Sequence, residues 1–370
     1  MRRRSVIVMA LCSTIIDNSS TREAKMRRRS VIVMALCSMY ALFFLFFQKE
    51  VCAQQRTWRL RWAYFATSDL PESKPMAEMA KRISQRTNGS VRVDIYWSDS
   101  LVPIFEILDA VRTGAAEMGT WPIGAFSAVE KSFAFAEVPL LYESFRAQVV
   151  AQEKLLPLLT EICEGKFNQK VLAMHPLFPL EVGSTKKTIK KLEDWKGLLV
   201  QTINPQMSAM VHAFGAKATP ISPTEVFEAL QKGVVDATIQ SVGKYTEAKL
   251  WEVCPYLTVT CLMPAALATS INKRMFDSLP KDYQAILLEE AKRMEEERTA
   301  ISLETYENYH LKILREKMRE CYFLPYTERL RWKEAVSEYV TRLLKELGPF
   351  GQKVKTIAEE ANAKYPYEYR

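Results

Sequence analysis

Residues 198–239 read LLVQTINPQMSAMVHAFGAKATPISPTEVFEALQKGVVDATI, and the order of strand-like and helical segments in them indicates the fold class. Leu198–Thr202 is apolar and rich in residues that favour strands. Pro205–Phe214 follows helical spacing and ends before Gly215, a residue type that commonly closes a helix. Val234–Ile239 again has the composition of a buried strand. Strand, helix and strand in this order indicate a parallel β–α–β unit.

A second helix is expected between these two strands. Ser222-Pro223-Thr224-Glu225 has the composition of a capping box, in which serine and glutamate side chains satisfy free backbone N–H groups at a helix start. Proline suits the first helical position, because its missing N–H would have no partner there. The helix is expected to end at Gly233.

The N-terminal part of the chain repeats this plan. Five segments alternate between strand-like and helical patterns: Trp58–Phe65, a helix through Met76, Met79 and Ile83, Val91–Trp97, Phe105–Arg112 and Ala116–Thr120. Each α/β unit is therefore expected to be a mainly parallel sheet covered by helices. The length exceeds one ordinary core and predicts two lobes. Because no Gly/Ser-rich linker separates them, ordered segments are expected to cross between the lobes.

One long helix is expected near the C-terminus. Lys281 to Met318 contains neither glycine nor proline, and its apolar residues keep helical spacing among many charges. Such a helix would be about 57 Å long at 1.5 Å per residue. It is longer than a small lobe, so it is expected to span both lobes.

The N-terminus contains a duplication. Met1–Ser13 reads MRRRSVIVMALCS, and Met26–Ser38 repeats it letter for letter. No globular repeat is this short. We interpret residues 1–25 as a duplicated leader and Met26 as the initiator.

Residues 26–53 have the layout of a secretory signal peptide. Three arginines precede the apolar segment Val31–Phe47, and Val51-Cys52-Ala53 resembles a cleavage site before Gln54. An uncleaved membrane anchor is the alternative, because the apolar segment is at the lower limit of what spans a bilayer. Lipid modification of Cys52 is a minor option, because Val51 replaces the small residue that it requires.

The net charge excludes a nucleic-acid-binding surface. The chain carries a formal charge of +8, but the 53 leader residues contain nine of the Lys/Arg residues and three of the Asp/Glu residues. The remainder has 42 basic and 40 acidic residues, so most of the excess positive charge belongs to the leader.

Four cysteines remain after the leader: Cys163, Cys254, Cys261 and Cys321. Export permits disulfides, but four cysteines are too few for a disulfide scaffold. Cys254 and Cys261 flank an extended run that would hold them about 20 Å apart, beyond bridging distance. We expect buried free thiols.

The sequence gives little sign of catalysis. His175, His212 and His310 are too far apart for a local zinc motif, and nucleotide-binding and hydrolase motifs are missing. His212 and His310 are interpreted as surface or capping residues. The run Glu289–Glu297 is interpreted as a solvated helix face with i,i+4 pairs rather than a metal site. We expect no enzyme activity, no cofactor and no metal, with a secreted enzyme built from distant residues as an alternative.

Several motifs resemble the DctP-type solute-binding proteins of tripartite ATP-independent periplasmic (TRAP) transporters, from about Leu60 to the C-terminus. They are Lys191–Val200 (KLEDWKGLLV), Phe214-Gly-Ala216, Thr219-Pro-Ile221, Thr224–Phe227, Ala229–Asp236, Glu137–Tyr142 and Met275–Pro280.

The resemblance implies a two-lobed clamshell of the type II-like periplasmic-binding-protein class, with a long helix bracing both lobes. One lobe would comprise residues 54–178 and 266–303, and the other residues 179–265 and 304–370. The ligand would bind in the cleft, and closure of the lobes would deliver it to TRAP membrane permease subunits. The location would be the periplasm, with inner-membrane anchoring if the leader is retained.

The resemblance also implies the positions of the ligand site. Typical relatives grip a carboxylate with an arginine where this chain has Gln201, and a second arginine falls on Glu181. The complete set of expected ligand-binding residues is Phe65, Thr67, Pro103, Ile104, Trp121, Pro122, Glu181, Gln201, Asn204 and Gln240.

Two hypotheses follow for the ligand. An apolar or non-carboxylate solute is the preferred one, because most of the expected polar lining is apolar here. This would resemble a branch that handles hydrophobic solutes together with a TPR-repeat helical protein. The alternative is a carboxylate bound by another basic residue, for example Lys186 or Lys187. An ATP-driven importer component and a membrane-tethered interaction module with a vestigial cleft are further alternatives.

Overall fold

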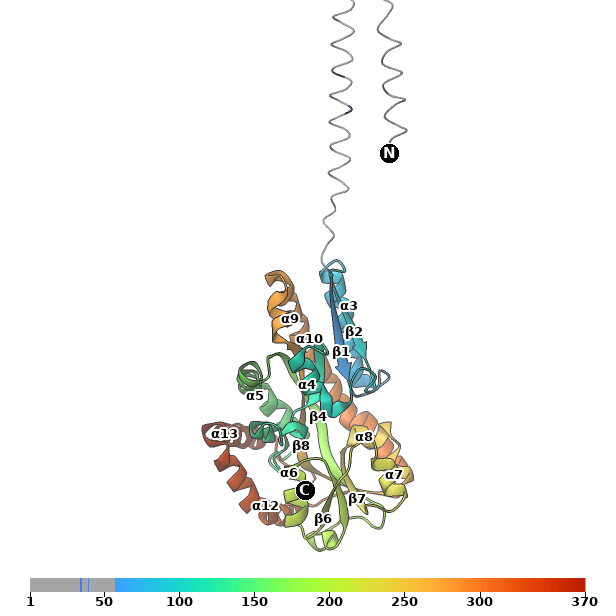
Figure 1. Ribbon diagram of the computed structural model, residues 1–370. Coiled ribbons are helices and arrows are strands. Elements are labelled where there is room, and N and C mark those ends of the chain that lie inside the picture. The colour runs from blue at the N-terminus through green and yellow to red at the C-terminus, as the bar shows by residue number, and fades with distance from the viewer. Residues whose placement is uncertain (1–33, 35–38, 40–56, 370) are drawn as a thin grey trace, which may run out of the picture. The chain divides into compact units, whose positions relative to one another are not determined.

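The computed structural model describes Met34, Met39 and residues 57–369. The chain divides into residues 1–56 and a folded body, Thr57–Arg370 (Figure 1). The predictions for residues 1–25, for the signal peptide at 26–53 and for cleavage before Gln54 lie outside the described residues. Within the part that is described, no helix has the length and apolar character needed to cross a bilayer.

The first α/β unit forms as predicted. Strand β1 (Trp58–Tyr64) lies between β2 (Val91–Tyr96) and β3 (Met118–Pro122), and all three are parallel. Helix α3 (Lys74–Arg86) connects β1 to β2, and α4 (Ile107–Thr113) connects β2 to β3. The residues of α3 that share one face, Met76, Met79 and Ile83, are fully buried.

The second unit has the same plan. Parallel strands β6 (Lys217–Pro220), β5 (Leu199–Thr202) and β7 (Ala237–Ser241) lie side by side in this order. Helix α6 (Pro205–Ala213) connects β5 to β6, and α8 (Val242–Glu247) follows β7. Gly215 adopts a left-handed φ of 82°, which a glycine tolerates without a Cβ clash.

The predicted capping box is wrong. Helix α7 begins at Val226 and ends at Gln231, and the segment Ser222–Glu225 forms a turn before it. The Ser222 hydroxyl pairs with the Thr224 hydroxyl at 2.9 Å instead of capping a helix that starts at Pro223. The hydrogen bond between these two side chains competes with hydrogen bonding to the backbone N–H groups at a helix start, as is common for serine and threonine.

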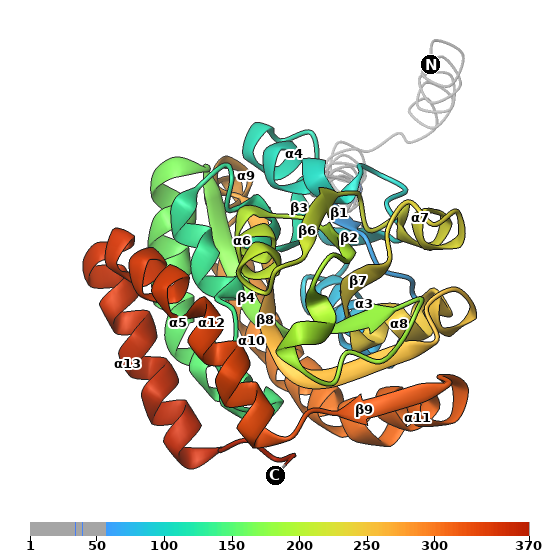
Figure 2. The same cartoon turned by 90° about the horizontal axis from the view of Figure 1, so that it is seen from below.

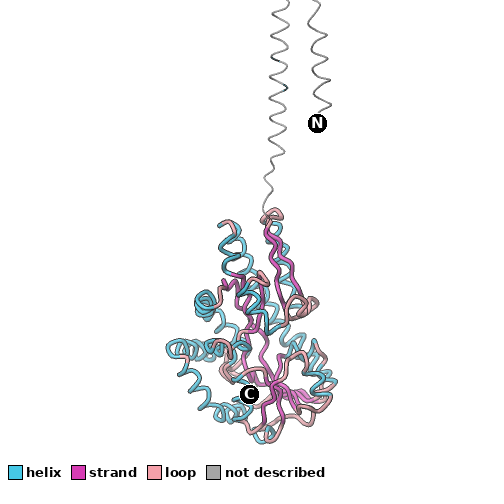
Figure 3. The backbone as a smooth tube through the Cα atoms, in the orientation of Figure 1, coloured by secondary structure: helices cyan, strands magenta, loops and turns pink. Residues whose placement is uncertain are grey.

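Two long strands join the two units into one sheet. Strands β4 (Gln169–Ser184) and β8 (Tyr256–Asn272) are antiparallel, and the strand order is β2-β1-β3-β8-β4-β7-β5-β6, with β9 (Glu320–Phe323) beside β8. Figure 3 shows the long central strands with helices on either side of them. The expected parallel sheet is therefore found within each unit. The prediction is wrong for the centre of the combined sheet, where β4 and β8 are antiparallel. The predicted ordered crossings between the lobes include these two strands.

The ladder between β4 and β8 is irregular where it passes from one unit to the other. Its register shifts between Leu177 and Leu180, and again between Leu180 and Val182. Pro179 has no N–H to donate within this part of β4. On β8, Cys261 has a left-handed φ of 50°. This segment connects the two α/β units.

The long C-terminal helix spans both units, as predicted, but it is not regular throughout. Helix α10 (Lys281–Thr305) continues as a π-helical turn, η7 (Tyr306–Leu311), and then as α11 (Lys312–Lys317). Helix α10 packs against α3 of the first unit, and α11 packs against α8 of the second. A π-helical turn widens the helix and rotates the residues that follow it.

The remaining helices cover the sheet. They are α5 (Phe145–Lys166), α9 (Lys273–Ser278), α12 (Tyr326–Glu346) and α13 (Gly348–Lys364), together with the 3-10 turns η1 (Pro71–Ser73), η2 (Ile104–Glu106), η3 (Gly124–Phe126), η4 (Lys131–Glu137), η5 (Leu192–Trp195) and η6 (Leu250–Glu252). Helix α13 packs against α5 and lies beside α12 (Figure 2). The lobe boundaries expected from the resemblance stay a prediction. Under those boundaries, α5 belongs to the first lobe, whereas α13, which packs against it, belongs to the second.

The four cysteines are free, as expected. Cys163, Cys254 and Cys261 are buried, and Cys321 is half-buried. Burial raises the pKa of the Cys163 thiol to about 12, so this thiol is protonated at neutral pH.

Candidate functional site

A cavity of about 140 Å³ lies where the carboxyl ends of parallel strands from both units meet. Tyr64 and Pro122 end β1 and β3, Ser241 ends β7, and Ile203 follows β5. In open α/β sheets, ligands bind outside the carboxyl ends of the strands, because the connecting loops leave a crevice there. The cavity is therefore the candidate ligand site.

Most of the cavity wall is apolar. The apolar lining residues are Phe65, Ala66, Leu70, Ile104, Pro122, Leu177, Phe178, Leu180, Ile203, Pro223 and Ile239. Four of the residues predicted from the sequence, Phe65, Ile104, Pro122 and Gln240, are brought together here.

Three other predicted residues lie around the first unit but do not line the cavity. Thr67 is half-buried, and its carbonyl accepts the Ser73 hydroxyl at 2.7 Å. Pro103 is exposed before η2. Trp121 is fully buried in the core, where its indole N–H donates to Ser270 Oγ at 3.0 Å. Trp121 therefore has a packing role in this structure.

Gln201 is occupied by contacts within its own unit. Its Oε1 accepts from Thr238 Oγ1 at 2.8 Å and from Gln240 Nε2 at 2.9 Å, and its Nε2 donates to the Ile221 carbonyl at 2.7 Å. The side chain is fully buried and does not line the cavity. Its effect on the cavity is indirect, because it orients Gln240, which does line it.

Glu181, which the resemblance placed among the ligand-binding residues, does not line the cavity. Its carboxylate accepts the backbone N–H groups of Thr260 and Cys261, both at 2.9 Å, and of Leu262 at 3.4 Å. Burial raises the pKa of this carboxyl to about 7 although these three hydrogen bonds oppose the rise. The residue satisfies the irregular backbone of β8 and would not repel an acid in the cavity.

Asn204 contributes at the border between the units. Its Oδ1 accepts the Met207 N–H at 2.9 Å and caps α6, while its Nδ2 donates to the Glu137 carboxylate, which lines the cavity. Burial raises the pKa of Glu137 to about 7, and the hydrogen bond from Asn204 opposes this rise. Ser127 donates to Gln206 at 2.7 Å across the same border.

The long helix supplies polar residues that sequence reasoning missed. Arg298 of α10 and His310 of η7 line the cavity and are 3% and 0% exposed. The predicted surface or capping role of His310 is therefore wrong. Its Nδ1 pairs with Thr246 Oγ1 at 2.7 Å, and its Nε2 lies 3.4 Å from the Glu72 carboxylate. Burial alone would raise the pKa of Glu72, but hydrogen bonds from His310 and Thr305 lower it.

No pattern in the sequence identifies Arg298 as a buried residue. It directly follows a run of charged residues that was interpreted as a solvent-exposed helix face. That interpretation holds for Arg293, which is exposed and pairs with Glu297 at 2.9 Å. It is wrong for Glu290, which is buried and pairs with Arg82. The π-helical turn after Thr305 could not be predicted from residue spacing, and it sets the direction of His310.

The loop after β2 and helix α8 complete the polar lining. Asp99 lies in the loop, and Lys244 pairs with Glu247 at 3.3 Å on α8. Burial raises the pKa of Asp99, although Lys244 opposes the rise.

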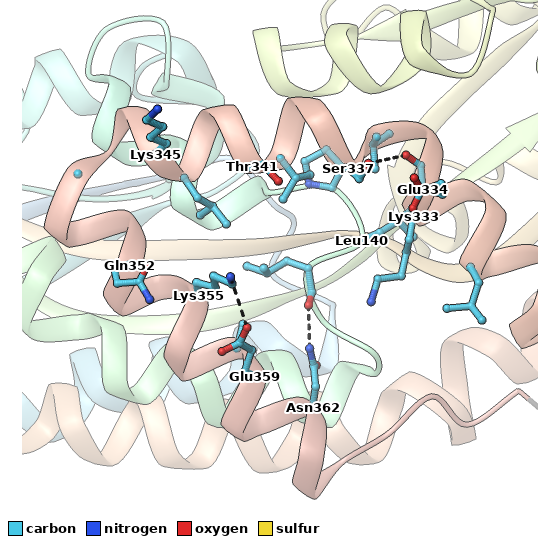
Figure 4. A pocket seen from close by; sticks show the side chains of 18 residues that line it. Leu140, Lys333, Glu334, Ser337, Thr341, Lys345, Gln352, Lys355, Glu359 and Asn362 are labelled. Carbon is cyan, nitrogen blue, oxygen red and sulfur yellow. Dashed lines mark hydrogen bonds and ion pairs between the residues drawn. The ribbon is translucent and has the colours of Figure 1, made fainter.

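A larger hollow of about 770 Å³ lies elsewhere, between α12 and α13 (Figure 4). Lys355 pairs with Glu359 at 3.8 Å along its wall, and Asn362 donates to the Leu141 carbonyl at 2.9 Å. None of the predicted ligand residues line this hollow, and all of its helical lining residues belong to α12 and α13. We therefore assign the ligand site to the smaller cavity between the units.

Among the residues that the structure describes, no three His, Cys, Asp or Glu side chains are placed to hold a metal ion. The acidic residues of the cavity are spread over η1, η4, α8 and the loop after β2.

Two α/β units that are joined by crossing strands and enclose a cavity define the class of two-lobed binding proteins. Residues 62–347 match the family described as "Bacterial extracellular solute-binding protein, family 7", DctP. The chain belongs to this family, which confirms the resemblance. The family consists of transport solute-binding proteins and not of enzymes.

Similar proteins include the C4-dicarboxylate-binding periplasmic protein DctP of Rhodobacter capsulatus, which is 24% identical over 78% of this chain and 87% of its own length. A solute-binding protein of Verminephrobacter eiseniae is 28% identical over 58% of this chain, and the match spans 64% of that protein. The sugar acid binding protein DctPAm of Advenella mimigardefordensis, solved with galactonate, has a TM-score of 0.77 at 21% identity and covers 83% of this chain and 99% of that chain. The structural match confirms the predicted clamshell fold.

Proposed function

We propose that this protein is the extracytoplasmic solute-binding subunit of a TRAP-type transporter, which captures a small molecule and delivers it to membrane permease subunits. The observation that carries the proposal is the cavity between the α/β units, which is lined by strand ends of both units and by the helix that spans them. Movement of the units about the irregular crossing of β4 and β8 would open and close it.

The size and lining of the cavity favour a small ligand with a largely apolar body. A cavity of about 150 Å³ accommodates a molecule the size of benzene, and this one is about 140 Å³. Each Å² of apolar ligand surface buried against Phe65, Ile104 and Ile239 would contribute about 25 cal/mol.

The preference against carboxylates depended partly on Gln201 and Glu181, which occupy the positions of the relatives' arginines, and neither side chain lines the cavity. We therefore keep a ligand with a largely apolar body in the proposal. The alternative, in which another basic residue binds a carboxylate of the ligand, is now also supported. The similar proteins described above bind a C4-dicarboxylate and galactonate. Lys186 is not the basic residue, because it pairs with Asp236 at 2.6 Å outside the cavity lining.

Location in the periplasm is part of the same proposal, and the signal-like residues 26–53 support it. Association with a TPR-repeat protein stays a prediction.

Calorimetry on unfolded, refolded and ligand-free protein tests the proposal, with small acids, amides and alcohols of five or six carbons as probes. A solute-binding protein should bind at least one compound saturably and release it chemically unchanged. A transport role further requires that uptake of this compound into proteoliposomes with the permease subunits depends on the protein. Conversion of the compound, or saturable binding without any effect on uptake, would contradict the proposal.

A further inference from the structure

The cavity contains a buried arginine whose charge is not matched by an acidic partner. Arg298 is 3% exposed and projects from α10 to the cavity. One terminal nitrogen, Nη1, donates to the backbone carbonyl of Glu72, and the Tyr64 hydroxyl lies beside the guanidinium. The Nε–H is buried and has no hydrogen-bond acceptor.

Glu72, whose carbonyl accepts from Arg298, already has partners for its carboxylate. The Glu72 carboxylate accepts the hydroxyl of Thr305 and lies 3.4 Å from His310 Nε2. Within residues 57–369, no carboxylate lies close enough to Arg298 to form an ion pair. A guanidinium out of contact with both water and an anion is unfavourable, so its position is explained if an anion completes the site.

A second unpaired atom lines the same cavity. Asp99 Oδ1 is buried and has no hydrogen-bond donor. Asp99 comes from the loop after β2, whereas Arg298 comes from the long helix. Among the described residues that line the cavity, Arg298 Nε and Asp99 Oδ1 are the two buried side-chain atoms without a partner. One requires an acceptor and the other a donor.

We propose that Arg298 binds the anionic group of the ligand through its Nε–H, and that Asp99 accepts a hydroxyl or N–H from the same molecule. The ligand class is then a small organic acid with a mostly apolar body and one hydrogen-bond donor. This inference rests on the proposed function and identifies the residues that bind the polar groups of the ligand. Arginine suits this role because its planar group can offer two parallel donors to one carboxylate.

The test uses the full exported protein in three forms: wild type, Arg298→Met and Arg293→Met. Arg293 lies on the same helix and is exposed, and it does not line the cavity, so its variant is a matched control. Small molecules released on denaturation are identified by mass spectrometry. Ligand-free protein is then titrated with 3-methylbutanoate, 3-hydroxy-3-methylbutanoate and 3-methylbutanamide, as well as with any released compound.

We expect wild type and Arg293→Met to carry or bind an acid, with 3-hydroxy-3-methylbutanoate bound more tightly than 3-methylbutanoate and both more tightly than the amide. Arg298→Met should weaken acid binding about 30-fold or more, as expected when one partner of a buried charge pair is removed. Arg298→Lys should bind with intermediate affinity, because it retains the charge without the planar fork. It also covers the case in which Arg298→Met does not fold.

Asp99→Asn should reduce the advantage of the hydroxy acid over the plain acid. Equal binding of one compound by wild type and a folded Arg298→Met, or a released ligand without an acidic group, would overturn this inference while the proposed function stands. A wild-type protein that neither carries nor binds any compound would contradict the proposed function as well.

Discussion

The carboxylate of Glu181 accepts the backbone N–H of Cys261 at 2.9 Å, where β8 takes a left-handed φ of 50°. The same carboxylate accepts two neighbouring N–H groups, so one side chain of β4 satisfies three donors of β8 that the regular ladder leaves free. The contact stabilises the segment that connects the two α/β units.

Glu181→Ala should therefore lower the free energy of unfolding by about 3 kcal/mol, because three buried N–H groups lose their acceptor. Glu181→Gln keeps one acceptor oxygen and should cost less. Glu193→Ala is the control, since Glu193 is exposed in a surface pair with Arg331 and should change stability far less than Glu181→Ala. Urea unfolding measures all three, and a Glu181→Ala variant as stable as the control would contradict the assigned role.

The stability of the protein should depend on pH through Glu137. Burial raises the pKa of its carboxyl from the ordinary 4.5 to about 7. Between these values the folded state holds a proton that the unfolded state has lost, so this group makes stability fall as pH rises from about 4.5 to about 7. The change should be on the order of 3 kcal/mol.

The difference in stability between wild type and Glu137→Gln isolates this contribution, because other acidic groups, such as Glu72 and Glu290, have lowered pKa values and act in the opposite direction below about pH 4.5. Thermal unfolding of both proteins at pH 5, 6, 7 and 8 is the measurement. If the difference does not change with pH, Glu137 titrates normally and the burial argument fails.

Gln201→Arg should not create an acid-binding site. The glutamine makes three buried hydrogen bonds within its unit, and an arginine would break them without reaching the cavity. A loss of about 2 kcal/mol in stability is expected, compared with less than about 0.5 kcal/mol for Gln231→Arg on the surface of α7. Calorimetry with 3-methylbutanoate and succinate tests this, and tighter acid binding by Gln201→Arg would show that the residue faces the ligand.

The regular parts of the fold could be predicted because their residues follow the periods of a helix or a strand. Met76, Met79 and Ile83 share one helix face, and the Gly/Pro-free run from Lys281 spans both units. Strands β4 and β8 could not be recognised in this way. Their residues are buried on both faces, so the alternation that identifies a half-exposed strand is missing.

Part of the candidate site was predicted, mainly where the site follows strand ends. Phe65 follows β1 and Pro122 ends β3; the resemblance placed both in the ligand site, and both line the candidate cavity. Arg298 and His310 come from a helix distant in sequence, and their inward direction depends on packing and on the π-helical turn. Glu181 was misplaced because the register shifts of β4 rotate it away from the cavity.

The exported protein should begin at Gln54, because Val51-Cys52-Ala53 fits a cleavage site. Intact-mass analysis of protein recovered from the periplasm measures this directly. Retention of residues 31–47 would indicate a membrane anchor in place of a cleaved signal.

The cavity between the two units is proposed to hold a small solute. Ile104 lines this cavity from η2, whereas its neighbour Phe105 is 39% exposed and does not line it. Ile104→Trp should fill the cavity, and Phe105→Trp provides the matched control. The decisive measurement is quantitative mass spectrometry of the small molecules released from each denatured protein. One compound is expected at about one equivalent from wild type and Phe105→Trp, and none from Ile104→Trp; release of the same amount from Ile104→Trp would show that the solute does not occupy this cavity.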